Sequence, residues 1–159
     1  MPEARSFHEI AETFDERVRR IVWCTVTTMD TKGRPFSRIL HPIWEGATGW
    51  IATGRHTLKS KHLAGNSMVA LSYWDAQHDT VIAQCRAEWC DDDATRRRIW
   101  ELLAKTPPPV GYDPSLFFKE GPGDPGYGVL RLTPTRVELW AGQDMLQGRL
   151  PTVWKAAVA

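Results

Sequence analysis

The stretch from residue 34 to residue 63 constrains this chain more than any other part of it. Two apolar, strand-like runs flank a glycine-containing turn, and a short basic segment follows. Hydroxyls and backbone N–H groups near a helix start, supported by lysine and arginine, can bind a doubly charged phosphate. This segment offers such groups at Thr53, Arg55, Thr57, Lys59, Ser60 and Lys61. Basic residues in a surface turn are also commonly just a solvated face, and that alternative stays open on composition alone.

Hydrophobic periodicity along the chain predicts a mainly β, α+β protein. Runs rich in β-branched and aromatic residues alternate with turn residues, without a strand–helix–strand repeat. We expect strands, the last two a hairpin joined at Pro134, over residues 21–29, 35–44, 50–53, 68–74, 80–92, 127–133 and 136–140. Helices are expected up to about residue 20 behind a Ser6–Glu9 capping box, at a short segment opening at 57–59, and after an acidic start at 91–93. An antiparallel barrel of six or seven strands with three short peripheral helices is the simplest architecture.

Length, charge and cysteine content narrow the class of protein. A chain of 159 residues suits a single domain over 1–159. The formal net charge of +1 gives no global field for nucleic acid or an anionic membrane. The charged N-terminus lacks an apolar leader, and no apolar run approaches roughly eighteen residues, so we expect a soluble, cytoplasmic protein. Three cysteines, an odd number, indicate reduced thiols.

The segment from 106 to 126 contains six prolines and four glycines around Tyr112, Phe117 and Phe118. A long segment of this kind inside a compact domain is usually functional, and disorder is the competing interpretation. Its aromatic residues favour a loop that docks on the domain.

The sequence gives little support for a metal site or for a nucleophilic catalytic residue. His41, His56 and His62 are separated by fifteen and six residues, which matches no metal-ligand pattern, and we expect no metal site. His41 in an apolar strand is more typical of a core or pocket residue. No glycine-rich dinucleotide motif, P-loop or nucleophile elbow is present.

The order of residues in the 34–63 stretch resembles the FMN-binding split barrels, the pyridoxamine 5′-phosphate oxidase-like superfamily, which also includes deazaflavin (F420) binders. In the oxidase, an Arg begins an Arg-x-x-x-x-Lys run, a Tyr-Thr pair ends the next strand, and Ser-Arg-Lys opens a helix. Arg38, Thr53, Thr57 and Lys59 match the Arg, the Thr, the Ser and the final Lys in that order. The resemblance extends closely to about residue 89 and more loosely to about residue 140.

The chain also departs from the family's pattern. Ile43, Ala52 and Leu58 stand where the oxidase has Lys, Tyr and Arg, so the phosphate site has fewer cations. The oxidase ends in an Arg-Leu-His-Asp-Arg-type motif that helps to hold pyridoxal phosphate. The nearest string here, 148–151, lacks both the His and the second Arg, so vitamin B6 oxidation is not expected.

The resemblance implies a split β-barrel that binds FMN, or alternatively F420, between the two subunits of a homodimer. The cofactor phosphate would lie on Thr57, Lys59 and Lys61, and the ring system along Arg38 and the backbone of Ile39 and Leu40. Thr53 belongs to the same matched set, and Thr80 aligns with a Gln that approaches the flavin in the oxidase. Trp44, Trp74 and Trp89 are candidates for walls of the ring or substrate site.

The function implied is hydride transfer between a flavin and an unidentified small molecule, with no catalytic residue assigned. An F420-dependent reductase is the first alternative. A carrier or sensor that binds flavin or haem without turnover is the second.

Overall fold

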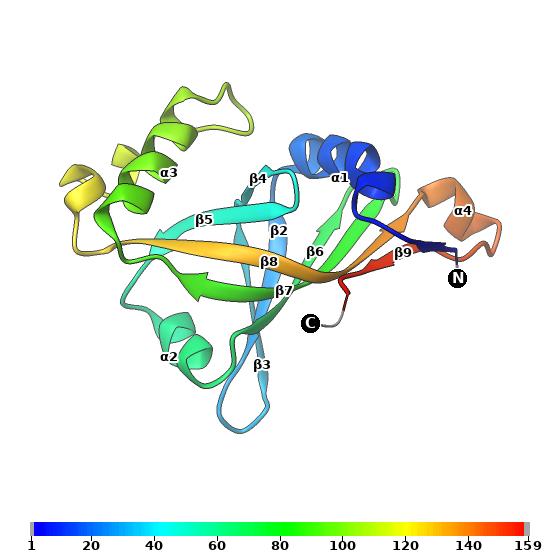
Figure 1. Cartoon of the computed structure of the whole chain (residues 1–159), viewed down its shortest axis with the longest axis horizontal. Coiled ribbons are helices and arrows are strands. Elements are labelled where there is room, and N and C mark those ends of the chain that lie inside the picture. The colour runs from blue at the N-terminus through cyan, green and yellow to red at the C-terminus, as the bar shows by residue number, and fades with distance from the viewer. Residues whose placement is uncertain (1, 158–159) are drawn as a thin grey trace.

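The computed structural model describes residues 2–157, and this part of the chain contains nine strands and four α-helices (Figure 1). The strands are β1 (Glu3–Ala4), β2 (Cys24–Met29), β3 (Pro35–Leu40), β4 (Ile43–Glu45), β5 (Thr48–Gly54), β6 (Met68–Trp74), β7 (Thr80–Trp89), β8 (Tyr127–Trp140) and β9 (Thr152–Lys155). The helices are α1 (His8–Ile21), α2 (Leu58–Gly65), α3 (Asp93–Lys105) and α4 (Gly142–Leu146), with short 3-10 turns at Pro114–Leu116 and Gly121–Gly123. In residues 2–157 no helix is long and apolar enough to cross a membrane.

The strands form one sheet in the order β1-β9-β8-β7-β6-β2-β3, with the β4–β5 pair joined to the other side of β8. Neighbouring strands are antiparallel, apart from the parallel β1–β9 pair. This architecture is a split β-barrel, as expected from the sequence. The described part has nine strands instead of six or seven for two reasons. Strand β4 is separate from β3, and two short strands are added near the termini, β1 pairing with β9 and β9 with β8.

Strand β8 organises the sheet, and here the expected C-terminal hairpin is wrong. Residues 127–140 form one continuous strand that pairs with β7 from Leu130 to Trp140, with a bulge between Gln84 and Cys85. On its other side, β5 pairs up to Leu132 and β9 begins only at Arg136. Pro134 therefore sits between two partners, where its missing N–H costs no ladder hydrogen bond.

Helix α1 covers one face of the barrel through an apolar stripe. Ile10, Phe14 and Val18 are buried against the sheet. The buried Arg17 donates from Nη1 to the carbonyl oxygens of Thr80 (3.0 Å) and Trp140 (2.7 Å), which fixes the helix across β7 and β8. The expected capping box does not form, because the helix begins one residue later with no side chain capping its N-terminus.

Helix α3 packs on a second, smaller apolar cluster outside the barrel. Ile99 and Leu103 are fully buried there, with Tyr127 and Val129 of β8. Asp92 caps the helix by accepting a hydrogen bond from the Thr95 N–H over 2.8 Å. The 106–126 segment, which we call the lid, continues directly from α3 (Figure 1).

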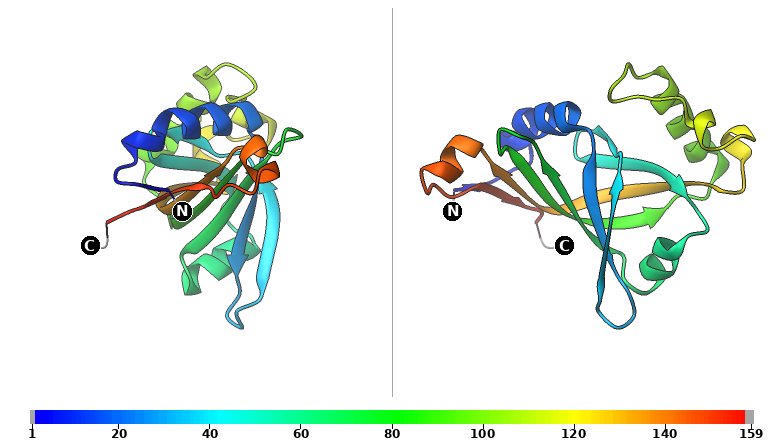
Figure 2. Two further views of the ribbon diagram at one scale, coloured as in Figure 1. Left: turned by 90° about the vertical axis from the view of Figure 1, so that its right-hand side faces the viewer. Right: turned by 180° about the vertical axis from the view of Figure 1, so that it is seen from behind.

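The β2–β3 hairpin extends away from the body of the molecule in both views of Figure 2. Strand β3 pairs only with β2, so it is an edge of the sheet in the described chain. Helix α2 follows β5 and packs against β2. The ends of β3 and β5 and the start of α2 therefore lie on neighbouring elements, and these carry the segment singled out in the sequence.

Candidate functional site

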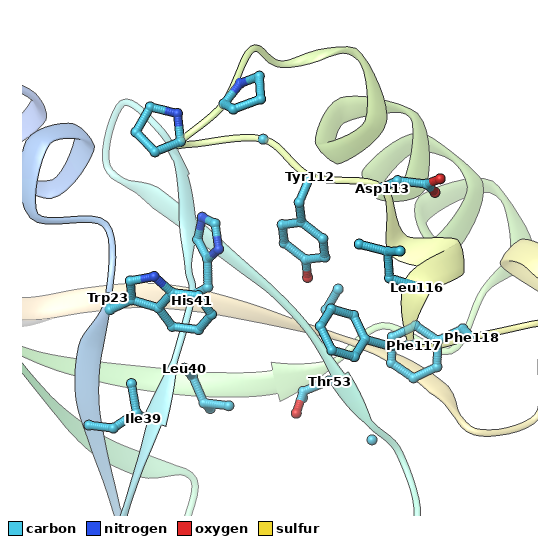
Figure 3. A pocket seen from close by; sticks show the side chains of 15 residues that line it. Trp23, Ile39, Leu40, His41, Thr53, Tyr112, Asp113, Leu116, Phe117 and Phe118 are labelled. Carbon is cyan, nitrogen blue, oxygen red and sulfur yellow. The ribbon is translucent and has the colours of Figure 1, made fainter.

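A pocket of about 760 Å³ opens between the strand ends and the lid (Figure 3). Its floor is formed by β3 and β5, and its roof by the lid. The lining is mostly apolar and aromatic: Trp23, Ile39, Leu40, His41, Ala52, Thr53, Gly54, Pro108, Pro109, Gly111, Tyr112, Asp113, Leu116, Phe117 and Phe118. No lysine or arginine is among these residues.

The lid is docked, as its aromatic content indicated. His41 Nε2 donates to the carbonyl oxygen of Val110 over 2.7 Å, and the ring of Tyr112 lies 5.0 Å from that of His41. The Tyr112 N–H donates to the carbonyl oxygen of Leu103 over 3.0 Å, which attaches the lid to α3. Burial lowers the pKa of His41, so its neutral form, with the proton on Nε2, is favoured. His41 is thus a pocket residue that holds the roof in place.

Two cations meet at the edge of this pocket. Lys59 is buried, and its Nζ donates to Thr57 Oγ1 (2.7 Å) and to the carbonyl oxygen of Gly54 (3.3 Å), a pocket residue. Burial lowers the pKa of Lys59, and the positive charge of Arg38 lowers it further. Burial also lowers the pKa of Arg38. Within residues 2–157 neither cation forms an ion pair with a carboxylate, so this pair of charges suits an anionic ligand.

Neutral groups hold Arg38 in position. Its Nη1 donates to Thr28 Oγ1 (2.8 Å) and to the carbonyl oxygen of Val26 (3.2 Å). Arg38 lies opposite Val26 in the β2–β3 ladder, so Thr28 is its diagonal neighbour on the buried face. Thr28 Oγ1 lies 2.8 Å from Nδ1 of the buried His62, which comes from α2.

A second recess, of about 400 Å³, lies at the start of α2. It is lined by Arg55, His56, Thr57, Leu58, Ser60 and Lys61. Arg55 is already engaged, because it pairs with Asp91 over 2.7 Å and lies 4.7 Å above the ring of Trp89. Lys61 is exposed and forms no ion pair in the described chain. Lys59 thus links the two cavities, because its Nζ donates both to Gly54 of the apolar pocket and to Thr57 of the recess.

The structure brings together seven of the eight cofactor-binding candidates. Ile39, Leu40 and Thr53 line the pocket, Thr57 and Lys61 line the recess, and Arg38 and Lys59 form the cation pair.

Thr80 lies elsewhere in the chain. It begins β7 opposite Trp140, whereas the pocket end of β8 is at Tyr127, opposite Gly54. Its side-chain hydroxyl is buried without a hydrogen-bond partner in the described residues. One chain therefore does not place Thr80 at this pocket.

The tryptophan candidates do not line the pocket. Trp44 is in the main core, where its Nε1 donates to Tyr73 Oη over 2.9 Å. Trp74 is exposed on β6, and Trp89 supports Arg55. Trp23 does line the pocket, and nothing in the sequence indicated this role. It was expected to lie inside a strand over 21–29, whereas β2 begins only at Cys24.

Thr28, His62 and Tyr112 also escaped assignment to the site. Thr28 and His62 carry no signal in the sequence, because only strand pairing and the position of α2 bring them to Arg38. Tyr112 had a weak signal, as an aromatic residue in a long proline-rich segment.

The fold and site together define a split-barrel protein with a cation pair beside an apolar ligand pocket. The model of the pyridoxamine 5′-phosphate oxidase family matches residues 10–141. The chain belongs to this family. It lacks the terminal motif of the B6 oxidase proper, so the relationship is to the wider family. A search of curated protein sequences gave no match.

Solved structures agree on the fold. A Clostridium acetobutylicum protein related to general stress protein 26 of B. subtilis has a TM-score of 0.70 at 18% identity, covering 84% of this chain and 89% of that one. A nimc/nima family protein from the same organism has a TM-score of 0.68 at 11% identity, with coverages of 85% and 87%. A pyridoxamine 5′-phosphate oxidase-related, FMN-binding protein from Nostoc punctiforme has a TM-score of 0.59 at 15% identity, with coverages of 87% and 84%.

Proposed function

We propose that this protein is an FMN-dependent oxidoreductase. The cation pair beside an apolar pocket carries the proposal, because FMN joins a phosphate to a flat, largely apolar ring system. Lys59, Thr57 and Arg38 would hold the phosphate, and the ring would lie along Ile39, Leu40 and Thr53 on the pocket floor. The FMN-binding description of the Nostoc punctiforme neighbour supports this choice.

The chain's own residues would bind and orient the cofactor and exclude water. Bound FMN supplies hydride-transfer chemistry, which no side chain can perform. His41 and the lid close the apolar side of the pocket, and Lys59 and Arg38 offset the phosphate charge. No catalytic side chain is assigned.

F420 is the second candidate cofactor, and the polar recess favours it. F420 carries a longer anionic tail than FMN, and Lys61 with His56 lines a recess just past Thr57. Titration of the purified protein with FMN and with F420 tests both proposals. If neither cofactor binds with a dissociation constant in the micromolar range or below, an isoalloxazine-type cofactor is rejected.

Turnover is separable from binding. The absorbance spectrum of the loaded protein, followed by anaerobic addition of NADPH, distinguishes an enzyme from a carrier or sensor. Bleaching of the flavin supports the oxidoreductase, whereas bound colour that NADPH does not reduce supports a carrier. A Soret band in the purified protein would instead favour haem.

A homodimer belongs to the proposal. Within residues 2–157, β3 is an edge strand whose outer side has no partner, and it exposes Phe36 and Ile39, the latter 60% exposed. Trp23 is 56% and Phe117 68% exposed at the pocket rim. A second copy that covers this apolar rim would also complete the ring site, as in the two-subunit arrangement implied by the resemblance.

We also place the protein in the cytoplasm. Cys24, Cys85 and Cys90 are free thiols, which is typical of a reducing compartment. Detection of the native protein in cell fractions tests this location.

A further inference from the structure

His62 and Lys59 lie on the same face of α2. They are three residues apart, so they are neighbours on the helix surface, and both side chains are buried. Helix α2 packs against β2, beside the β2–β3 hairpin (Figure 2). The ring of His62 lies 4.9 Å from that of Phe36 on β3. The buried face of α2 therefore brings a cation to the edge of the pocket and an imidazole to the hairpin.

The cation pair of Arg38 and Lys59 is held together against its own repulsion. The charge of Arg38 lowers the pKa of Lys59, so the two side chains are close enough to repel each other. Within residues 2–157 no carboxylate forms an ion pair with either of them. Without a bound anion, packing and neutral hydrogen bonds must therefore fix their positions.

Thr28 Oγ1 lies between Arg38 and His62, and its proton decides the direction of the hydrogen bonds. A guanidinium can only donate, so Oγ1 accepts from Arg38 Nη1 over 2.8 Å. Thr28 is buried, and the other partner of its Oγ1 in the described chain is His62 Nδ1, at 2.8 Å. A proton on Nδ1 would leave the Thr28 hydroxyl proton buried without an acceptor, which is unfavourable. Thr28 therefore donates to Nδ1, and the ring of His62 carries its proton on Nε2.

We propose that His62 is a positioning residue for the phosphate end of the proposed cofactor site. By accepting the Thr28 proton, Nδ1 fixes the rotation of the hydroxyl and turns an oxygen lone pair toward Arg38. Because His62 and Lys59 share one helix, this relay from Arg38 through Thr28 to His62 also sets the spacing of the two cations. His62 lines neither cavity, so it acts through Thr28 without contacting the cofactor. The identity of the ligand rests on the proposed function, and the relay rests on the hydrogen-bond geometry.

Long-range proton–nitrogen correlation NMR spectra of the full-length protein, recorded without FMN, test the relay itself. At pH 8, where an imidazole is ordinarily neutral, we expect the His62 ring to be protonated at Nε2 and unprotonated at Nδ1. The signals of His62 are assigned by their loss in His62→Asn. A ring protonated at Nδ1 would overturn the inference, whether or not FMN binds.

Calorimetric titration with FMN and with riboflavin, which lacks the phosphate, tests the positioning role. His62→Leu should weaken FMN binding by about two- to tenfold, the equivalent of one neutral hydrogen bond, and leave riboflavin binding as in wild type. His62→Asn should restore most of the FMN affinity, because its amide oxygen takes the place of Nδ1 and accepts the same proton. Leu63→Ala is the matched control. It removes a buried apolar side chain from the same face of α2, so it should lower stability without a selective loss for FMN.

The outcomes separate this inference from the proposed function. An unchanged FMN affinity in His62→Leu, no recovery in His62→Asn, or an equal loss for FMN and riboflavin would overturn the positioning role even though FMN binds. Absence of FMN binding to the wild-type protein would overturn the proposed function. The protonated nitrogen of His62, measured without FMN, would then decide the relay by itself.

Discussion

Nη1 of Arg38 donates a hydrogen bond to Oγ1 of Thr28 over 2.8 Å, from one strand of the extended β2–β3 hairpin to the other. A neutral hydroxyl, in place of a carboxylate, thus fixes the guanidinium. Thr28 also meets His62 of α2, so the same hydroxyl links the hairpin to the helix that carries Lys59. The positive charge of Arg38 is positioned without being neutralised, which is the arrangement that an anionic ligand requires.

Thr28→Val should weaken FMN binding, although residue 28 acts only through Arg38 and would not contact FMN. The change removes the acceptor of Arg38 and leaves a side chain of similar shape, so we expect a loss of about two- to tenfold in affinity. Thr28→Ser should restore most of the affinity because it keeps the hydroxyl. Calorimetric titration of the three proteins with FMN measures this, and equal affinities would show that Arg38 needs no support from Thr28.

Lys59→Ala should weaken FMN binding by about 1.5–3 kcal/mol, the range for hydrogen bonds to charged groups. The folded protein should not lose stability, since burial lowers the pKa of Lys59 and no carboxylate pairs with it in the described chain. Binding titrations and urea unfolding together test this. Lys105→Ala is the control, because Lys105 pairs with Glu101 on the surface of α3. An unchanged FMN affinity in Lys59→Ala would show that Lys59 does not bind the cofactor phosphate.

Gly111→Ala should displace the lid. A Cβ at this position would lie 1.8 Å from the carbonyl oxygen of Thr106 and 2.7 Å from that of Leu103, and backbone atoms cannot yield as a flexible side chain can. We expect faster chymotrypsin cleavage within 106–126 and a loss of about 1–3 kcal/mol in unfolding free energy. Gly123→Ala, in the same segment, meets nothing within 4 Å and should behave like wild type. Equal cleavage rates in the two variants would contradict the docked lid.

His41 should make stability fall on acidification. Its pKa in the folded protein is lowered by burial, so below about pH 6.5 the unfolded chain binds more protons than the folded one. Stability is therefore lost as pH falls from 6.5 through the folded pKa. The difference in unfolding free energy between wild type and His41→Gln should narrow over that range, with His8→Gln as an exposed control. Urea unfolding from pH 8 to pH 5 measures it, and a constant difference would argue against a neutral, buried His41.

Ile39→Asp should separate the proposed dimer and weaken FMN binding. The wild-type protein should scatter light as a particle of about twice 18.0 kDa. A carboxylate on the exposed face of β3 would have to be buried in the interface, at a cost that opposes association. Leu146→Asp is the control, since Leu146 is 81% exposed on α4. A wild-type mass near one chain, with FMN bound, would reject both the dimer and a shared cofactor site.

The sequence by itself determined the local elements and the residues near the proposed phosphate. Alternating apolar residues identified β6 within its observed bounds, and turn residues located most of the other strands. The order of Arg38, Thr53, Thr57 and Lys59 identified the family's pattern, because these residues fall in one short stretch. Local information gave a wrong prediction at Pro134, because a proline normally indicates the end of a strand. Here β8 continues through Pro134, which lies in the gap between its two partners β5 and β9.

Only the tertiary structure decided what surrounds these residues. Thr28 and His62 reach Arg38 through strand pairing and helix packing, which no spacing in the sequence records. The lid contacts His41 from about seventy residues away along the chain, through the Val110 carbonyl oxygen. Thr80 is separated from the pocket because β8 is one long strand: Thr80 lies opposite Trp140 at one end of it, and the pocket lies at the other end, where Tyr127 is opposite Gly54. Short-range periodicity fixes which face a residue presents, whereas a binding site depends on which distant faces pack together.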